Sequence, residues 1–274
     1  MLSSIKYSKL RLRDVDQPVS PKGPEASTYK TLRIDLAGNI LEMIMPRHNP
    51  PSSSHSQVSP TTYKIMQFGS RTFSTDSMPD QSWMYKTLLH RVWSFYGPWF
   101  TGILGDVSCS ISILEESDQK TGTSYFHPKV FEYSIYKYLT SLYENKTGSN
   151  IVEAPVKWEV LKTLPVPSAS FYVLPTRKVS GVIKKVIFPI SDQHLVEIHF
   201  RFSRSMWDRY HELHNLIDPE PMYQSVKTII SSLDLRLSSD SKKQLDEIKV
   251  SSSEILVTDT FPPINWSSAR PAIT

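Results

Sequence analysis

The sequence predicts an α+β fold, with a twisted, mostly antiparallel sheet packed against two or three helices and a disordered basic N-terminal arm. Several segments alternate apolar and polar residues with the period of two that is typical of half-buried strands. Others place apolar residues at the spacing of an amphipathic helix. Hydrophobic residues make up 39% of the chain, which is enough for a core and argues against wholesale disorder.

Polar segments that are rich in proline and serine divide the 274 residues into three parts. Residues 1–30 are predicted to be a flexible basic arm, because prolines interrupt them repeatedly. Residues 31–237 form the expected α+β core, with an exposed loop at 46–62. Residues 238–274 form a C-terminal tail rich in Ser and Pro. We therefore expect one domain with loose ends.

Strands are expected at five places in this core. Residues 32–45 predict a hairpin, because two apolar segments flank the tight-turn pair Gly38-Asn39. Residues 107–113 alternate apolar side chains with serines, and residues 195–203 alternate Val, Ile and Phe with charged or polar residues. Segments rich in Val, Ile and aromatics predict two further strands at 170–174 and 182–188.

Helical spacing occurs in three segments. In 80–96, polar residues recur every four positions against an otherwise apolar surface, which predicts a mostly buried helix. In 205–217 and 220–237, the apolar residues predict two amphipathic helices.

The formal net charge of +4 is concentrated at the N-terminus. Residues 1–13 contain four basic residues and no acidic one, namely Lys6, Lys9, Arg11 and Arg13. Such a cluster binds an anionic lipid surface with about 1 kcal/mol per basic residue, binds RNA phosphates, or is only a solvated terminus. Because the remainder of the chain is balanced in charge, a neutral body with a positive arm favours docking to an anionic surface.

Aromatic residues cluster between positions 83 and 100, and Gly97-Pro98 breaks the segment before its last two rings. Trp99 and Phe100 are therefore candidate anchors at a bilayer interface. Two other interpretations stay open, a buried core segment and an anchor for a protein partner. Near the C-terminus, Phe261-Pro262-Pro263-Ile264 is a candidate linear motif for a partner groove.

Enzymatic motifs are missing from the sequence. A single cysteine, Cys109, leaves no intrachain disulfide and no Cys-based metal site. The segment His211-Glu212-Leu213-His214 has its histidines three apart, whereas a zinc-protease helix needs them four apart. No nucleophile elbow is present. We expect no enzyme, no metal and no cofactor. Without a signal-peptide pattern or an apolar run of roughly 18 residues, we also expect a reducing compartment and no membrane span.

Two patches carry a family resemblance, WMYKTLLHRVWSFYGPWFTGILGDVSCSISIL at 83–114 and LVEIHFRFSRSMWDRYHELHNLI at 195–217. With the basic, proline-containing arm, their order resembles that of the matrix proteins of rhabdoviruses, and the chain length is closer to the plant-infecting members. The patches cover about a fifth of the chain. The usual Pro-Pro-x-Tyr and Pro-Ser/Thr-Ala-Pro budding motifs are absent.

This resemblance implies a viral matrix-like structural protein that links an anionic membrane to a ribonucleoprotein through self-association, in virion assembly and budding. The implied partners are an anionic membrane surface, viral nucleoprotein or RNA, further copies of the chain, and host factors. The implied locations are the virion and the host cytoplasm or nucleus, peripheral at membranes. Two alternatives stay open, a viral movement or accessory protein that binds single-stranded RNA, and an enzyme with no recognisable motif.

Overall fold

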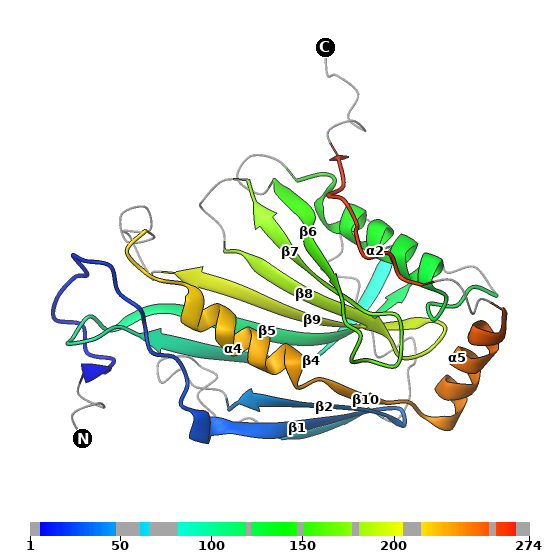
Figure 1. The fold of residues 1–274 in the computed structure, drawn as a ribbon, viewed down its shortest axis with the longest axis horizontal. Coiled ribbons are helices and arrows are strands. Elements are labelled where there is room, and N and C mark those ends of the chain that lie inside the picture. Colours follow the sequence, from blue (N-terminus) through cyan, green and yellow to red (C-terminus); the bar gives the residue numbers. More distant parts are fainter. Residues whose placement is uncertain are drawn as a thin grey trace, which may run out of the picture.

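The computed structural model describes residues 6–47, 61–65, 82–118, 122–146, 151–176, 181–204, 215–251 and 256–266. These residues form an α+β fold, as the sequence predicts, with two sheets and three α-helices in the described part. The helices are α2 (Pro128–Tyr143), α4 (Glu220–Ser231) and α5 (Ser239–Ser251). Figure 1 shows the larger sheet between α2 on one side and α4 with the smaller sheet on the other.

The smaller sheet has the strand order β10-β2-β1-β3. Its predicted hairpin is confirmed, since β1 (Tyr29–Leu36) pairs antiparallel with β2 (Asn39–Pro46). The turn lies at Ala37 and Gly38, one residue before the predicted pair, because Asn39 already belongs to β2. The φ angles of 52° and 91° are both left-handed, as a type I′ turn requires. The short strand β3 (Thr62–Ile65) adds parallel to β1, and β10 (Asp234–Arg236) adds antiparallel to β2.

The larger sheet has six strands in the order β4-β5-β9-β8-β7-β6, with every neighbouring pair antiparallel. Four of its strands were predicted in whole or in part, and all four predictions are confirmed. The predicted strands are β5, β7, β8 and β9. The bounds of all six are β4 (Trp83–Tyr96), β5 (Ile103–Glu116), β6 (Val152–Val160), β7 (Ala169–Pro175), β8 (Ile183–Pro189) and β9 (His194–Arg204).

The helix predicted at 80–96 is wrong, because this segment is the edge strand β4. The pairing with β5 shifts by one residue between Thr87 and Leu89. Such a bulge reverses which alternate residues face each side of the sheet. Trp83 therefore packs with α2, whereas Leu89 and Trp93 pack on the opposite face. Apolar residues on both faces produced the pattern of a buried helix.

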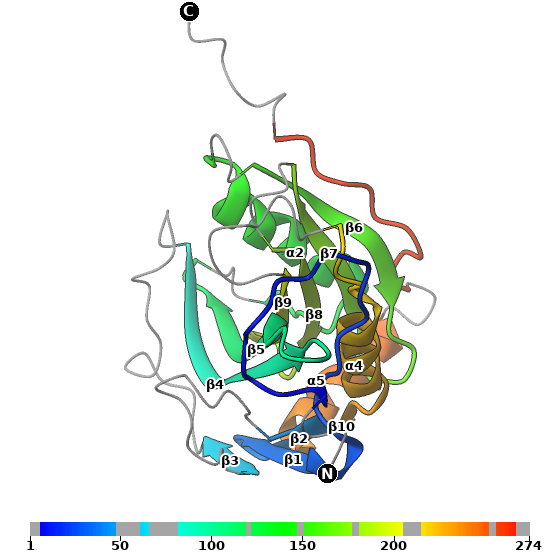
Figure 2. The ribbon, with the colours of Figure 1, turned by 90° about the vertical axis from the view of Figure 1, so that its left-hand side faces the viewer.

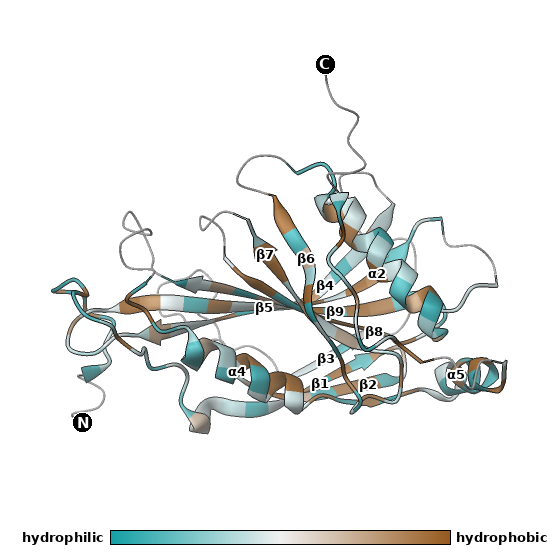
Figure 3. Ribbon diagram, turned by 45° about the horizontal axis from the view of Figure 1, so that its top comes forward, coloured by the Kyte–Doolittle hydropathy of each residue, from teal (hydrophilic) through white to brown (hydrophobic). Residues whose placement is uncertain are grey.

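The larger sheet carries a core on each face. One core joins it to the smaller sheet and to α4, through Ile111 and Ile198 of the large sheet and Ile34 and Ile229 opposite. The other core joins it to α2, where Phe131 and Ile135 are buried. Figure 2, seen from the end of the sheet, shows that the dark blue arm crosses in front of β5. In Figure 3 the strands and helices carry bands of both colours, which is the pattern of elements with one buried face.

Several predicted segments differ from the structure or lie outside the described residues. The helix at 220–237 is confirmed over α4, but its last residues form β10. The helix at 205–217 and the loop at 46–62 fall mostly outside the described residues. Helix α5 occupies part of the predicted C-terminal tail, where Leu245 is buried in the first core.

Candidate functional site

The N-terminal arm lies on the turn that joins β4 to β5. The carbonyl of Lys6 accepts a hydrogen bond from the Trp99 amide, and the Leu12 amide donates to the carbonyl of Phe100 over 2.7 Å. Arg11 forms an isolated antiparallel bridge with Thr101. The predicted basic arm and the predicted aromatic anchor are thus neighbours, although almost ninety residues separate them in sequence.

The turn has a strained backbone, because Trp99 and Phe100 have φ angles of 48° and 69°. Residues other than glycine seldom adopt this left-handed region. Each such conformation costs about 1–3 kcal/mol and persists only where the surrounding structure holds it. Here the Gly97 amide donates to the carbonyl of Gly102 over 2.8 Å, and the Thr101 hydroxyl donates to the carbonyl of Pro98. These bonds and those of the arm hold the backbone of the turn.

Three further attachments hold the arm beside this turn. Val15 is buried against Leu104 and Ile217. The Val19 amide donates to the carbonyl of Leu216 over 2.8 Å. Lys22 exchanges two backbone hydrogen bonds with Tyr96, of 2.8 and 2.9 Å. The described part of the arm has little regular secondary structure, but its path over the body is defined.

Large apolar side chains stay exposed where the arm meets the turn. The exposed fractions are 71% for Leu12, 52% for Leu10 and 45% for Trp99. Lys6 lies beside them, with its Nζ atom 5.8 Å from the centroid of the Trp99 ring, which is within cation–π range. We call this set the basic–aromatic surface; it consists of Lys6, Lys9, Leu10, Arg11, Leu12, Arg13 and Trp99.

The charge on this surface is mostly uncompensated. Arg11 pairs with Asp14 at 2.7 Å, but both side chains are about half exposed, and such a pair is weak in water. Lys9 and Arg13 form no ion pair within the described ranges. The surface therefore presents cations beside a Trp ring and two Leu side chains.

Five of the six residues predicted for this site come together in it. Phe100 differs, because its side chain is only partly exposed and its carbonyl is what holds the arm. Sequence reasoning missed Leu10 and Leu12. The alternation of cations and leucines from Lys9 to Arg13 was the available signal.

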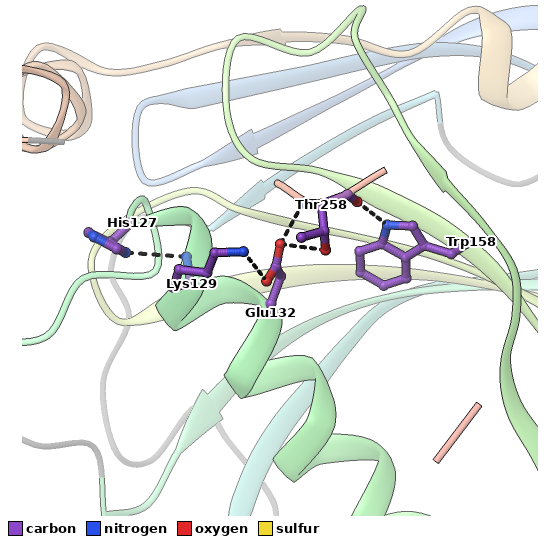
Figure 4. Close-up of polar contacts among 5 residues, drawn as sticks. All are labelled: His127, Lys129, Glu132, Trp158 and Thr258. Atoms are coloured by element: carbon purple, nitrogen blue, oxygen red, sulfur yellow. Dashed lines mark hydrogen bonds and ion pairs between the residues drawn. The ribbon is translucent and has the colours of Figure 1, made fainter. Parts of the chain in front are cut away.

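The predicted partner motif, Phe261 to Ile264, contacts the protein's own body. The Phe261 ring lies 5.0 Å from that of Trp158, and the Ile264 amide donates to the carbonyl of Ala154 over 2.8 Å. The same segment, 256–266, is held to α2, where Glu132 accepts hydrogen bonds from the amide and hydroxyl of Thr258 (Figure 4). It covers the edge strand β6 and α2, so the motif is engaged within the chain.

A second polar cluster lies between the larger sheet and α2. Lys185 on β8 and Glu197 on β9 form a buried ion pair, and the Tyr138 hydroxyl of α2 donates to Glu197 over 3.1 Å. Burial alone would raise the pKa of Glu197, but Lys185, His199 and Tyr138 together hold it below its ordinary value. Burial lowers the pKa of Lys185, whereas Glu197 raises it, and the pKa lies above its ordinary value. Both groups are therefore charged.

A small cavity of about 210 Å³ adjoins this cluster. His199 lines it, and burial lowers its pKa to about 4, so the ring is neutral at physiological pH. On the neighbouring strands, His90 Nδ1 and Ser110 Oγ lie 2.9 Å apart. Glu197 interacts electrostatically with His199, but its hydrogen bonds go to Lys185 and Tyr138. We interpret the arrangement as a structural network.

Other chemistry in the described ranges is limited. They contain no group of three or more His, Cys, Asp or Glu residues arranged to hold a metal ion. Cys109 is fully buried on β5, and burial raises the pKa of its thiol above the ordinary range, which makes it unreactive. None of the helices described is long and apolar enough to cross a bilayer. No protein-family model matches the chain, and no curated protein is significantly similar to it.

Proposed function

We propose that this protein is a matrix-like structural protein that attaches peripherally to anionic membranes through the basic–aromatic surface. The observation that supports the proposal is that the arm's cations lie beside exposed Trp99, Leu10 and Leu12 at one end of the molecule. Cations attract an anionic leaflet, while exposed rings and leucines insert at the boundary of headgroups and acyl chains.

The expected affinity follows from these groups. Four basic residues contribute about 1 kcal/mol each near an anionic leaflet. The three apolar side chains are already partly covered, so each contributes roughly 1 kcal/mol on insertion. A total of roughly 6–8 kcal/mol corresponds to a dissociation constant on the order of 1–50 μM in accessible lipid. Attachment of this strength is reversible and depends on salt.

The resemblance to rhabdovirus matrix proteins extends the proposal to self-association and to a link with a ribonucleoprotein during virion assembly. The geometry of the basic–aromatic surface supports only the membrane step. Assembly on a membrane would raise the local concentration of the chain and so favour self-association.

Co-sedimentation with vesicles tests the membrane step. We expect the protein to pellet with phosphatidylserine vesicles at low salt, to release partly at high salt, and to bind phosphatidylcholine vesicles weakly. Lys9→Glu with Arg13→Glu should abolish binding, and Leu12→Ser should weaken it. Lys242→Glu with Lys243→Glu is the matched control, because these lysines are equally exposed but lie on α5.

Two results would contradict the proposal. One is failure of the wild type to bind anionic vesicles at any salt concentration. The other is an equal loss of binding in the α5 control, which would indicate a diffuse charge effect. Trp99→Gly adds a check on folding, because glycine accepts a φ of 48° without strain and should preserve stability while weakening binding.

A further inference from the structure

A cleft separates α4 from the part of the larger sheet formed by β6, β7 and β8. Its volume is about 690 Å³, which lies within the range of roughly 300–1,000 Å³ that small-molecule sites occupy. Lysines and tyrosines supply most of its polar groups, and we call it the lysine–tyrosine cleft. These lysines and tyrosines are Lys157, Lys162, Tyr172, Lys184, Tyr223 and Lys227.

Lys184 is the most unusual group of the cleft. Only 8% of its side chain is exposed, and its Nζ atom lies 4.4 Å from the centroid of the Tyr172 ring. Its one ion pair in the described ranges is with Glu159 at 3.9 Å, and 68% of that carboxylate side chain is exposed. Burial lowers the pKa of Lys184 to about 8, and Glu159 only partly opposes this. A buried cation with so weak a counter-ion would be stabilised by an anion in the cleft.

Other cations lie around Lys184. The Nζ atom of Lys157 lies 5.9 Å from the centroid of the Tyr172 ring, and its backbone has a left-handed φ of 52°. Lys162 and Lys227 line the same cleft, and the carboxylates among its described lining residues are Glu159 and Glu220. The local balance is therefore positive, and the two lysines nearest Tyr172 are placed to meet one anionic group.

Aromatic rings line the cleft next to these cations. Tyr172 and Tyr223 meet edge to face, with their ring centroids 6.4 Å apart. Tyr223 also packs edge to face on Phe202 at 4.8 Å, which fixes its orientation. A fixed, half-buried tyrosine beside lysines suits a flat ring that carries a phosphate, because bases stack on aromatic side chains while cations bind their phosphates.

We propose that the lysine–tyrosine cleft binds a nucleoside phosphate, with the phosphate at Lys184 and Lys157 and the base against Tyr223. The ligand is either a free nucleotide or one nucleotide of a single RNA strand, since the recognised chemistry is the same. This site is separate from the basic–aromatic surface, and its occupation does not depend on membrane attachment.

Calorimetric titration of the full chain tests the proposal, with uridine monophosphate, uridine, inorganic phosphate and a short oligouridylate as probes. We expect the monophosphate to bind more tightly than inorganic phosphate, and uridine to bind least. Lys184→Met should weaken nucleotide binding by at least tenfold, and Tyr223→Leu should weaken it severalfold. Lys242→Met, on α5 and outside the cleft, is the matched control and should bind as the wild type does.

The oligouridylate shows whether the ligand is a free nucleotide or part of an RNA strand. Tighter binding than that of the monophosphate, with the same dependence on Lys184, indicates an RNA strand, and equal binding indicates a free nucleotide; both support the site. Absence of nucleotide binding, binding that Lys184→Met leaves unchanged, or equal affinity for inorganic phosphate would overturn it. Because Lys184→Met removes a buried cation, it should fold at least as stably and still bind anionic vesicles, which separates this test from that of membrane attachment.

Discussion

Replacing Lys185 by Met removes the cation from the buried ion pair with Glu197. The exposed fractions of the two side chains are only 2% and 7%, so water cannot replace the lost partner. The carboxylate keeps the Tyr138 hydroxyl at 3.1 Å but has no buried cation beside it. Removing one member of such a pair costs about 3–5 kcal/mol, a large part of the roughly 5–15 kcal/mol that stabilises an ordinary domain.

The double variant Lys185→Met/Glu197→Gln separates the charge effect from packing. Both charges are then absent, and the amide oxygen of Gln still accepts the hydrogen bond from Tyr138. We expect most of the stability to return, to within about 1–2 kcal/mol of the wild type. Glu197→Gln alone leaves Lys185 charged and buried, and it should be about as destabilising as Lys185→Met.

Urea unfolding measures these effects, and its pH dependence checks their cause. In the wild type, the lowered pKa of Glu197 and the raised pKa of Lys185 stabilise the fold between about pH 5 and pH 10. In Lys185→Met the unpaired carboxyl titrates above its ordinary pKa, so stability should fall as pH rises above about 4. A single-variant cost below about 1 kcal/mol, or a double-variant cost equal to the sum of the singles, would refute the reasoning.

Three further changes test other parts of the structure. The pKa of His199 is lowered to about 4, so this ring should add up to about 1.4 kcal/mol of stability per pH unit between pH 4 and 6.5. His194, whose pKa is also lowered to about 4, adds a slope of the same sign, so His199→Gln should reduce the slope without abolishing it in unfolding titrations. Gly105→Ala should lower stability by about 1–3 kcal/mol in thermal unfolding, because a Cβ there would meet the backbone carbonyl of Ser203 on β9 as well as the end of the Met222 side chain. Glu132→Ala removes both side-chain bonds to Thr258 and should speed amide exchange across 256–266, with little change in the core strands.

Each of these expectations has a contrary result. An unchanged pH slope in His199→Gln would indicate that the ring is not held neutral by burial. The comparison must be made with the wild type, because burial raises the pKa of Asp106 to about 6, which gives a slope of opposite sign. A fully stable Gly105→Ala would show that β5 lies less close to the β9 backbone and to α4 than the structure indicates. Unchanged exchange in Glu132→Ala would show that the other contacts of the segment suffice to hold it, namely the ring contact of Phe261 with Trp158 and the hydrogen bonds of Trp158 with Thr258 and of Ile264 with Ala154.

The strands β5 and β9 could be predicted because each keeps one register along its length. Ile111 and Ile198 are paired across the two strands and face the same core, and the next pair, Ser110 and His199, is polar. Strand β4 could not be predicted in this way. The bulge near Leu88 reverses which alternate residues face each core, and buried Arg91 interrupts the apolar alternation. Arg91 donates to the carbonyl of Pro46 on the smaller sheet, a partner that is not apparent from the local sequence.

The candidate site was only partly predictable, because its residues can be identified from local composition but their contact cannot. Local composition identified Lys6 to Arg13 as basic and Trp99 as a candidate anchor. Their contact depends on the β4–β5 pairing, which places the turn at the end of the sheet where the arm passes. The lysine–tyrosine cleft was not predicted at all, because Lys184 and Tyr223 belong to separate elements, β8 and α4.

Membrane insertion of Leu12 is the most direct test of the central claim. Cys109 is the only native cysteine and is fully buried, so a thiol-reactive, polarity-sensitive dye will label Leu12→Cys selectively. With phosphatidylserine vesicles at low salt we expect a blue shift of the dye at Leu12→Cys and none at Lys242→Cys on α5. If the labelled protein pellets with these vesicles while the dye at Leu12→Cys shows no shift, the basic–aromatic surface is not the membrane anchor.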